Sequence, residues 1–488
     1  MSRRGVVAID QGTTSTRAIR FGPDRQVQAT ASRELASRYP RPGWVEQDPE
    51  VIWADALATL REVVTDDVAA IGLTNQRETI VLWDRKTGKP LHDAIVWQDR
   101  RTAELCADLI ADGLEPEVRA KTGLLLDPYF SATKLCWLLD TIEGARARAE
   151  RGELAAGTID SFLLWRLTGG AVHATDVTNA ARTLLYDIGR HRWDEDLAKL
   201  FDIPLAILPE VRANAHLFGE TDLSIVGRRI PIAGMAGDQQ AALIGQGCFR
   251  PGMAKSTYGT GCFLLTHIGG APTLSSKRLL TTPAYRIGDE DAYAMEGSIF
   301  IAGAAIKWLR DRMGLIGDAA QTAALAASVP AGHGVHLVPA FVGLGAPHWR
   351  TDVRATISGM TLDTGAAHIA RAALEAVAYQ TCDLVDTMTA DGIAPPALLR
   401  IDGGMAANDW FAQYLADMLD LSVERPANHE TTALGAAYLA GLTTGLWSAG
   451  SAPSQDPPPQ RFEPRLTAAA RSSALDGWRA AVRQVLAA

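Results

Sequence analysis

The chain has 488 residues, and because a single hydrophobic core stops growing at roughly 250–300 residues, this length predicts two domains. Hydrophobic residues make up 47% of the chain and charged residues 21%, which is the profile of a soluble globular protein. The formal net charge of -9, with no run rich in Lys and Arg, argues against nucleic acid as a partner.

The five cysteines lie far apart and form no CxxC pair, which argues against a zinc site or a disulfide framework and favours free buried thiols. The N-terminal apolar run, residues 6–9, is too short for a signal-peptide core. No stretch approaches the ~18 apolar residues of a membrane span. We therefore expect a cytoplasmic protein that does not insert into membranes.

The N-terminal segment predicts a strand, a turn and a second strand. Residues 6–21 carry this pattern, with turn-forming residues at 10–14 between two runs of β-formers. A similar unit lies near the middle of the chain at residues 253–265, with the turn GTG at 259–261. Two such units half a chain apart suggest two related domains.

Strand-like and helix-like segments alternate through both halves, which indicates α/β layers. Strands are expected at residues 69–73, 79–83 and 398–401, and helices at 49–65, 129–140 and 368–388. Asn408 is predicted to be the N-cap of a further helix that has one apolar face. Residues 450–464, rich in Pro, Ser and Gln, favour a loop, and residues 466–488 favour a terminal helix.

The segment DQGTTSTR, residues 10–17, combines a tight glycine turn with several hydroxyl side chains and one Arg. Phosphate groups are bound by such donors when they converge without bulky side chains. Asp10, at the end of the first strand, could hold Mg²⁺ directly or through water. An ordinary hairpin with a polar tip would look the same, but the second turn favours the phosphate interpretation, because a nucleotide between two domains needs donors from both. The chain has no Walker A pattern, so a P-loop fold does not explain the motif.

An ordered set of motifs resembles the FGGY carbohydrate kinases and, within that family, the glycerol-kinase branch. The resemblance runs from about residue 5 to about residue 445. The motifs are AIDQGTTSTRA (8–18), NQRETIVLWD (75–84), VWQDRRT (96–102), AGDQQAALIGQG (236–247), KSTYGTGCFLL (255–265), AGAAIKWLRD (302–311) and DGGMAAND (402–409).

The resemblance implies an α/β fold with two actin-like or hexokinase-like (ribonuclease H-like) domains and a nucleotide cleft between them. The N-terminal kinase domain, with the polyol site and the first phosphate loop, is expected at residues 1–247. The C-terminal kinase domain, with the adenosine site and the second phosphate loop, is expected at residues 248–450, and a loop and helix at 451–488.

The implied activity is the ATP-dependent phosphorylation of glycerol to sn-glycerol 3-phosphate, with Mg²⁺ as the metal. Asp238 matches the family's catalytic base, and we assign Asp10 as the second catalytic carboxylate and the metal ligand. A carboxylate at the start of a helix stays ionised and can accept the proton of an attacking hydroxyl. The structural alternative for Asp238 is an N-cap that only stabilises its helix.

The remaining site residues are implied by their match to the family's motifs. Those for the polyol hydroxyls are Arg77, Glu78, Tyr129, Asp238 and Gln239, with Trp97 and Phe263 as aromatic walls. Those for the nucleotide are Thr13, Thr14, Ser15, Arg17, Thr260, Gly303, Lys307, Gly404 and Asn408. Lys307 departs from the family, which usually has Gln there, and this change could alter the contacts to the ribose or phosphates.

Two other functions stay open. One is a kinase for another small polyol or ketose, such as erythritol or xylulose, although the aromatic and charged pocket residues favour glycerol. The other is a non-catalytic actin-like protein, against which the retained Asp10 and Asp238 argue. The expected partners are glycerol and ATP, and we expect a homo-oligomer, either a dimer or a tetramer.

Overall fold

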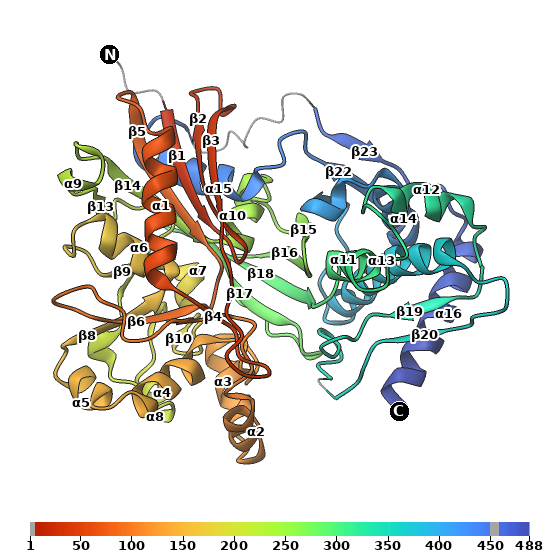
Figure 1. Ribbon diagram of the computed structural model, residues 1–488, viewed down its shortest axis with the longest axis horizontal. Coiled ribbons are helices and arrows are strands. Elements are labelled where there is room, and N and C mark those ends of the chain that lie inside the picture. Colours follow the sequence, from red (N-terminus) through yellow and green to blue (C-terminus); the bar gives the residue numbers. More distant parts are fainter. Residues whose placement is uncertain (1–4, 351, 449–457, 488) are drawn as a thin grey trace.

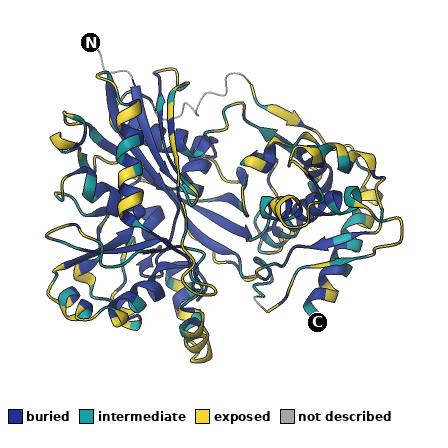
Figure 2. Ribbon diagram, in the orientation of Figure 1, coloured by how far each residue is buried: buried dark blue, intermediate teal, exposed yellow. Residues whose placement is uncertain are grey.

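The computed structural model describes residues 5–350, 352–448 and 458–487 (Figure 1). Its frame is two large mixed sheets, one in each half of the chain. The first sheet has the strand order β13-β14-β5-β1-β2-β3, and the second has the order β17-β18-β16-β15-β21-β22-β23. Figure 2 shows that most of both sheets is buried, while exposed residues gather on the outer faces of the helices.

The bounds of the strands in the first sheet are β1 (Gly5–Gln11), β2 (Ser15–Phe21), β3 (Val27–Glu34), β5 (Val68–Asn75), β13 (Gly219–Glu220) and β14 (Pro231–Gly237). Those in the second are β15 (Ala254–Tyr258), β16 (Cys262–Gly269), β17 (Leu280–Ile287), β18 (Glu290–Ile299), β21 (Leu398–Asp402), β22 (Ser422–Arg425) and β23 (Gln460–Phe462). The shorter strands are β4 (Glu46–Gln47), β6 (Ile80–Asp84), β7 (Ala94–Ile95), β8 (Leu154–Thr158), β9 (Ala174–Asp176), β10 (Tyr186–Asp187), β11 (Arg192–Trp193), β12 (Glu210–Arg212), β19 (His336–Val338) and β20 (Thr356–Ser358).

The helices of the first half are α1 (Pro49–Val63), α2 (Ala103–Ala111), α3 (Glu115–Thr122), α4 (Ser131–Thr141), α5 (Ala145–Glu150), α6 (Ile159–Leu167), α7 (Val177–Ala180), α8 (Glu195–Leu200), α9 (Leu223–Val226) and α10 (Asp238–Gly245). Those of the second half are α11 (Gly303–Asp311), α12 (Gln321–Ser328), α13 (Ala366–Ala390), α14 (Asp409–Leu419), α15 (Thr431–Thr443) and α16 (Ala468–Ala487). Two 3₁₀ turns, η1 (Leu205–Ile207) and η2 (Gly404–Ala407), complete the described elements.

The two sheets repeat one arrangement of strands. In the first, β1 is antiparallel to β2 and parallel to β5, and β5 is parallel to β14. In the second, β15 is antiparallel to β16 and parallel to β21, and β21 is parallel to β22. The prediction of two related α/β units, each opening with a hairpin, is therefore confirmed.

The helices and strands expected from the sequence are present within a few residues of the predicted bounds. The N-cap prediction is also confirmed, because the side chain of Asn408 accepts a hydrogen bond of 3.1 Å from the backbone N–H of Phe411. The loop prediction for residues 450–464 is wrong in part. Residues 449–457 lie outside the described residues, but β23 forms an antiparallel pair with β22. This pairing covers a sheet edge that would otherwise be open, a long-range gain that local composition does not reveal.

Helix α15 connects the two halves, because it belongs to the second half in sequence but lies against the first sheet (Figure 1). Its alanines share a hydrophobic core with β1, β5 and α10. The contact is so close that a Cβ added to Gly435 would stand 1.8 Å from the carbonyl oxygen of Ala241 on α10. A Cβ on Gly72 of β5 would stand 2.2 Å from the carbonyl oxygen of Ala436. Glycine is therefore required at both positions by close backbone approach.

All five cysteines are free thiols. Among the described residues, no helix is both long and apolar enough to cross a membrane.

Candidate active site

The carboxyl ends of three adjacent parallel strands bring the central residues together. Asp10 lies near the end of β1, Arg77 and Glu78 follow β5, and Asp238 follows β14 as the first residue of α10. The registers place Gln11 and Gly237 on either side of Asn75, so the three strands end at the same level. In α/β sheets this edge is where ligands bind.

The turn after β5 has an unusual backbone. Glu78 has a φ of 62°, in the left-handed region that a non-glycine residue rarely adopts. Its carbonyl oxygen accepts a hydrogen bond of 2.8 Å from the hydroxyl of Ser131. Such strain persists only where surrounding contacts fix it, and it is concentrated at functional sites.

Arg77 is the centre of the site. Its side chain is 1% exposed, and its Nε lies 3.3 Å from the carboxylate of Asp238. Its Nη2 is 3.5 Å from the hydroxyl of Tyr129, and its guanidinium lies over the ring of Phe263, 5.7 Å from the centroid. The side chain therefore connects the carboxylate of α10 with the aromatic residues.

Asp238 keeps 29% of its side chain exposed although its neighbours are buried. The N-cap of α10 is Gly237, so the alternative role of Asp238 as an N-cap is wrong. Its carboxylate accepts a 2.8 Å hydrogen bond from the backbone N–H of Gln239. Burial raises the pKa of Asp238, and the charges of Arg77 and Lys255 oppose this shift. A carboxylate with a raised pKa that still reaches solvent is a suitable proton acceptor.

Aromatic rings surround the same point. Trp97 meets Tyr129 and Phe263 edge to face, with ring centroids 5.6 Å and 6.1 Å away. Gln239 is nearly buried, and its side-chain oxygen accepts a hydrogen bond of 2.5 Å from Nζ of Lys255. All the residues assigned to the polyol therefore lie in one place, and together they combine an apolar wall with polar groups.

The first hairpin turn is closed by a bond of 2.9 Å from the N–H of Gly12 to the carbonyl of Ser15. Within it, the hydroxyl of Thr13 accepts a 2.9 Å hydrogen bond from the indole N–H of Trp97, and Thr14 is exposed. Arg17 extends beside the turn and donates to Asp10 at 2.5 Å and to Glu430 at 2.6 Å. Because Glu430 directly precedes α15, the second half also contacts this hairpin.

The second hairpin turn contacts the start of α11. The backbone N–H of Gly303 donates to the carbonyl of Gly259 at 2.9 Å, and Thr260 is exposed at the tip. A Cβ on Gly303 would lie 2.6 Å from that carbonyl oxygen, so the approach requires glycine. Lys307 is exposed one helical turn further along α11, on the same face as Gly303.

Gly404 and Asn408 lie at the two ends of η2. Gly404 is exposed, and apart from its own chain neighbours no heavy atom of the described residues lies within 4 Å of where its Cβ would stand. The amide group of Asn408 donates to the hydroxyl of Thr322 at 3.0 Å while its oxygen caps α14. Asn408 is therefore a structural cap whatever else it does.

Three buried charges of the site were missed by the sequence analysis. Arg182 and Glu296 are fully buried and bonded to each other at 3.0 Å, and Lys255 is buried beside Gln239. Glu296 gave one usable signal, because a single acid interrupts an apolar stretch of β18. Arg182 stands in the ordinary sequence NAARTLL and gave none.

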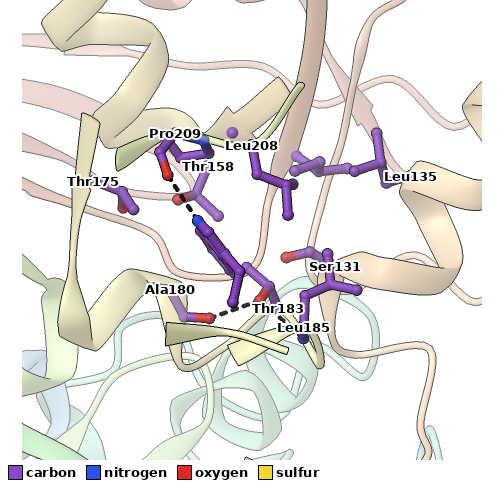
Figure 3. Close-up of a pocket in the computed structure, with 12 residues that line it drawn as sticks. Ser131, Leu135, Thr158, Thr175, Ala180, Thr183, Leu185, Leu208 and Pro209 are labelled. Carbon is purple, nitrogen blue, oxygen red and sulfur yellow. Dashed lines mark hydrogen bonds between the residues drawn. The ribbon is translucent and has the colours of Figure 1, made fainter. Parts of the chain in front are cut away.

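Behind the site lies a small cavity of about 10 Å³ (Figure 3). Ser131, which supports Glu78, and Thr175 both line it. Its volume suits about one water molecule and no organic substrate. We therefore do not assign it as the substrate site.

A network of buried carboxyl and amide groups supports the strands that carry the site. Asp160 accepts hydrogen bonds from the hydroxyls of Thr158 and Thr175, and Asp176 accepts one from the amide of Asn179. Burial, with the nearby charge of Asp176, raises the pKa of Asp160 to about 7. Burial thus favours the protonated form of this carboxyl group more than in an exposed Asp.

Replacing Asp160 with Asn is expected to reduce the pH dependence of stability. Because the folded-state pKa of Asp160 lies above its unfolded value, its contribution is present below about pH 4 and is lost as the pH rises through about 7. Denaturant unfolding at pH 5 and pH 8 measures this, and the wild type should lose more stability than Asp160→Asn between the two. Equal losses in both proteins would show that Asp160 does not titrate in this range.

Comparison with known proteins gives a consistent result along the whole chain. The model of the N-terminal domain of the FGGY family of carbohydrate kinases matches residues 5–245, and that of the C-terminal domain matches residues 254–444. A protein named glycerol kinase from Gluconobacter oxydans (strain 621H) is 59% identical over 99% of this chain and 95% of its own length. Another from Rhodospirillum centenum (strain ATCC 51521 / SW) is 57% identical over 98% of this chain and 97% of its own.

Solved structures are similar over the same extent. The crystal structure of Plasmodium falciparum glycerol kinase with ADP has a TM-score of 0.91 and 38% identity, and covers 99% of both chains. A ligand-bound xylulose kinase from Lactobacillus acidophilus has a TM-score of 0.88 at 20% identity, a likeness of fold alone.

Proposed function

Because the chain belongs to the FGGY family of carbohydrate kinases, we propose that it transfers the γ-phosphoryl group of ATP to glycerol and forms sn-glycerol 3-phosphate. The observation that carries this proposal is that full-length relatives at up to 59% identity are named glycerol kinase. The site supports it, since Asp238 and Arg77 meet beside a wall of aromatic rings. A kinase for xylulose is less well supported, because the xylulose kinases among the similar structures reach only 20–25% identity.

In the proposed reaction, Arg77 and Glu78 bind hydroxyl groups of glycerol and Asp238 accepts the proton of the attacking hydroxyl. The rings of Trp97 and Phe263 cover the carbon face of the substrate. Phosphoryl transfer asks the protein mainly for positioning and charge stabilisation, so one base in this position is sufficient. Tyr129 and Gln239 complete the hydroxyl contacts.

The two hairpin turns are proposed to bind the phosphates from opposite sides. Thr13, Thr14, Ser15 and Arg17 act from the first turn and Thr260 from the second. Gly303, Lys307, Gly404 and Asn408 are proposed to surround the adenosine. The exposure of Thr14, Thr260 and Lys307 supports these roles, because each side chain is open to a ligand.

Asp10 fits the role of a magnesium ligand. Arg17 bonds its Oδ2, and no described residue bonds Oδ1. Among the described residues, no group of three or more His, Cys, Asp and Glu side chains could hold a metal ion alone. This agrees with Mg²⁺, which is usually bound by one or two carboxylates together with substrate phosphates. When bound, Mg²⁺ neutralises charge on the phosphate oxygens.

A coupled assay of ADP release tests the proposed activity. Glycerol, erythritol, D-xylulose and a blank without acceptor are compared at fixed MgATP. We expect the largest kcat/KM with glycerol and little release in the blank. A larger kcat/KM with another acceptor would identify a different kinase, and no release with any acceptor would favour a non-catalytic protein.

Replacing Trp97 with Phe is expected to raise the KM for MgATP more than the KM for glycerol. Phe keeps an aromatic wall but loses the indole N–H that fixes the hydroxyl of Thr13. Loss of this bond costs about 1 kcal/mol, so the KM for MgATP should rise several-fold. Steady-state kinetics with each substrate varied in turn measures both constants, and a change in the glycerol KM alone would contradict the link.

We also propose a cytoplasmic homo-oligomer, either a dimer or a tetramer. The proposed use of ATP supports the cytoplasmic location. Light scattering after size-exclusion chromatography would give the mass of the assembly.

A further inference from the structure

Four charged side chains form a buried cluster behind the proposed glycerol site. We call Arg77, Glu78, Arg182 and Glu296 the four-charge cluster. Their side chains are 0–2% exposed. Glu296 bonds Arg77 at 2.6 and 3.1 Å and Arg182 at 3.0 Å, and Arg182 donates to Glu78 at 2.6 Å. Two positive and two negative charges therefore balance.

The cluster fixes Arg77 and Glu78, its two residues nearest the proposed site, from the interior of the protein. Arg77 makes its shortest bonds toward Glu296, whereas its Nε and Nη2 lie 3.3 Å from Asp238 and 3.5 Å from Tyr129. The strongly bonded edge of the guanidinium thus faces the interior, and the weakly bonded edge faces the site. A substrate hydroxyl can compete for the second edge without breaking the first.

Glu78 is held in the same way. Nε of Arg182 bonds its Oε1, while no described residue bonds its Oε2. The left-handed backbone of Glu78 and this single bond together fix the direction of the carboxylate. One oxygen is therefore engaged inside the protein and the other is available as an acceptor.

Stability alone does not explain this arrangement. Nη1 of Arg182 is buried without a hydrogen-bond partner in the described chain. A buried donor left unpaired is costly, and buried ion pairs are poor sources of stability compared with apolar residues of similar size. Glu296 also comes from β18, a strand of the second sheet, although the other three charges lie in the first half.

We propose that Arg182 and Glu296 are positioning residues that set the acceptor specificity of this site. Glu296 fixes Arg77 and Arg182 fixes Glu78, so that one donor edge and one acceptor oxygen face the site side by side. This pair matches two adjacent hydroxyl groups of a small polyol. The inference rests on the proposed function and concerns how its acceptor is held.

The test compares Glu296→Gln with a matched control, Glu375→Gln. Glu375 is also a buried carboxylate paired with an Arg, at 2.7 Å from Arg371 on α13. Glu296→Gln is expected to raise the glycerol KM roughly 10- to 100-fold, which is the effect of losing a hydrogen bond between charged groups. The KM for MgATP should change less than about threefold, a shift too small to reflect a lost hydrogen bond. Glu375→Gln should lower thermal stability and leave the glycerol KM unchanged.

A second variant covers the case in which Glu296→Gln does not fold. The double variant Arg182→Gln/Glu296→Gln keeps the buried charges balanced and should still show the raised glycerol KM. Glu296→Asp, which retains the charge, should recover part of the affinity. The rise in melting temperature caused by glycerol reports glycerol binding, and the rise caused by ADP reports nucleotide binding. Comparing the two in each variant tests the positioning role without turnover.

The outcomes separate this inference from the proposed function. One outcome is that the wild type releases ADP with glycerol while the Glu296 variants raise the KM for glycerol and the KM for MgATP equally, or leave both unchanged. This outcome would overturn the positioning role. If the wild type shows neither turnover nor a thermal shift with glycerol, the proposed function is overturned instead.

Discussion

Asp238→Asn is expected to lower kcat with glycerol about 10²–10⁴-fold, the usual effect of removing a general base. The amide cannot accept the hydroxyl proton, although it keeps the size of the carboxylate and its bond from the N–H of Gln239. Glycerol binding, measured by calorimetry, should change much less, because Arg77 and Glu78 remain in place.

A control for this substitution is Asp194→Asn. Asp194 is another carboxylate at a helix start, where it caps α8 and pairs with Lys121 at 2.8 Å. Its replacement should lower stability and leave kcat unchanged. If Asp238→Asn kept turnover within about threefold of the wild type, far less than loss of a general base allows, Asp238 would not be the base.

The second large effect is expected from Gly435→Ala. In most helices this change stabilises by roughly 0.5–1 kcal/mol, because alanine loses less conformational freedom. Here the added methyl would collide with the backbone of α10, where the carbonyl oxygen of Ala241 is 1.8 Å away. A backbone atom cannot rotate aside, so we expect a loss of about 3 kcal/mol, at the upper end for overpacking. Because α10 begins with Asp238, kcat should fall as well.

Gly477→Ala in α16 is the matched control for this prediction. Its Cβ would meet the ring of His336 at 2.8 Å, and a side chain can move away at little cost. Denaturant unfolding of both variants should show a loss only for Gly435→Ala. A stabilised Gly435→Ala would mean that α10 and α15 separate more easily than their contact suggests.

The family and the two-unit α/β fold were predictable because their signals are local. Each hairpin carries its turn and its strands within about fifteen residues, and Asp10 and Asp238 each stand at the end of an apolar strand. The convergence of Asp10, Arg77 and Asp238 follows from parallel strands, whose carboxyl ends share one edge.

The parts that were not predictable depend on contacts between distant segments. Nothing near Arg182 indicates that it bonds Glu78 and Glu296, because those partners lie 104 and 114 residues away. The packing of α15 against the first sheet also depends on distant segments. Its alanine-rich sequence would suit burial against either sheet. Strand β23 depends on the free edge of β22.

The turn of the first hairpin has four residues between the paired Gln11 and Thr16, whereas that of the second has three between Tyr258 and Cys262. Counted from the end of the first strand in each hairpin, Gly12 matches Gly259 and Thr13 matches Thr260. The facing pair of Asp10 and Arg17 is replaced in the second hairpin by Thr257 and Phe263. Both turns thus offer a hydroxyl, while only the first also carries a charged pair. For a nucleotide bound as proposed, with its phosphates between the two turns, this difference between the hairpins would favour one direction of the phosphate chain over the other.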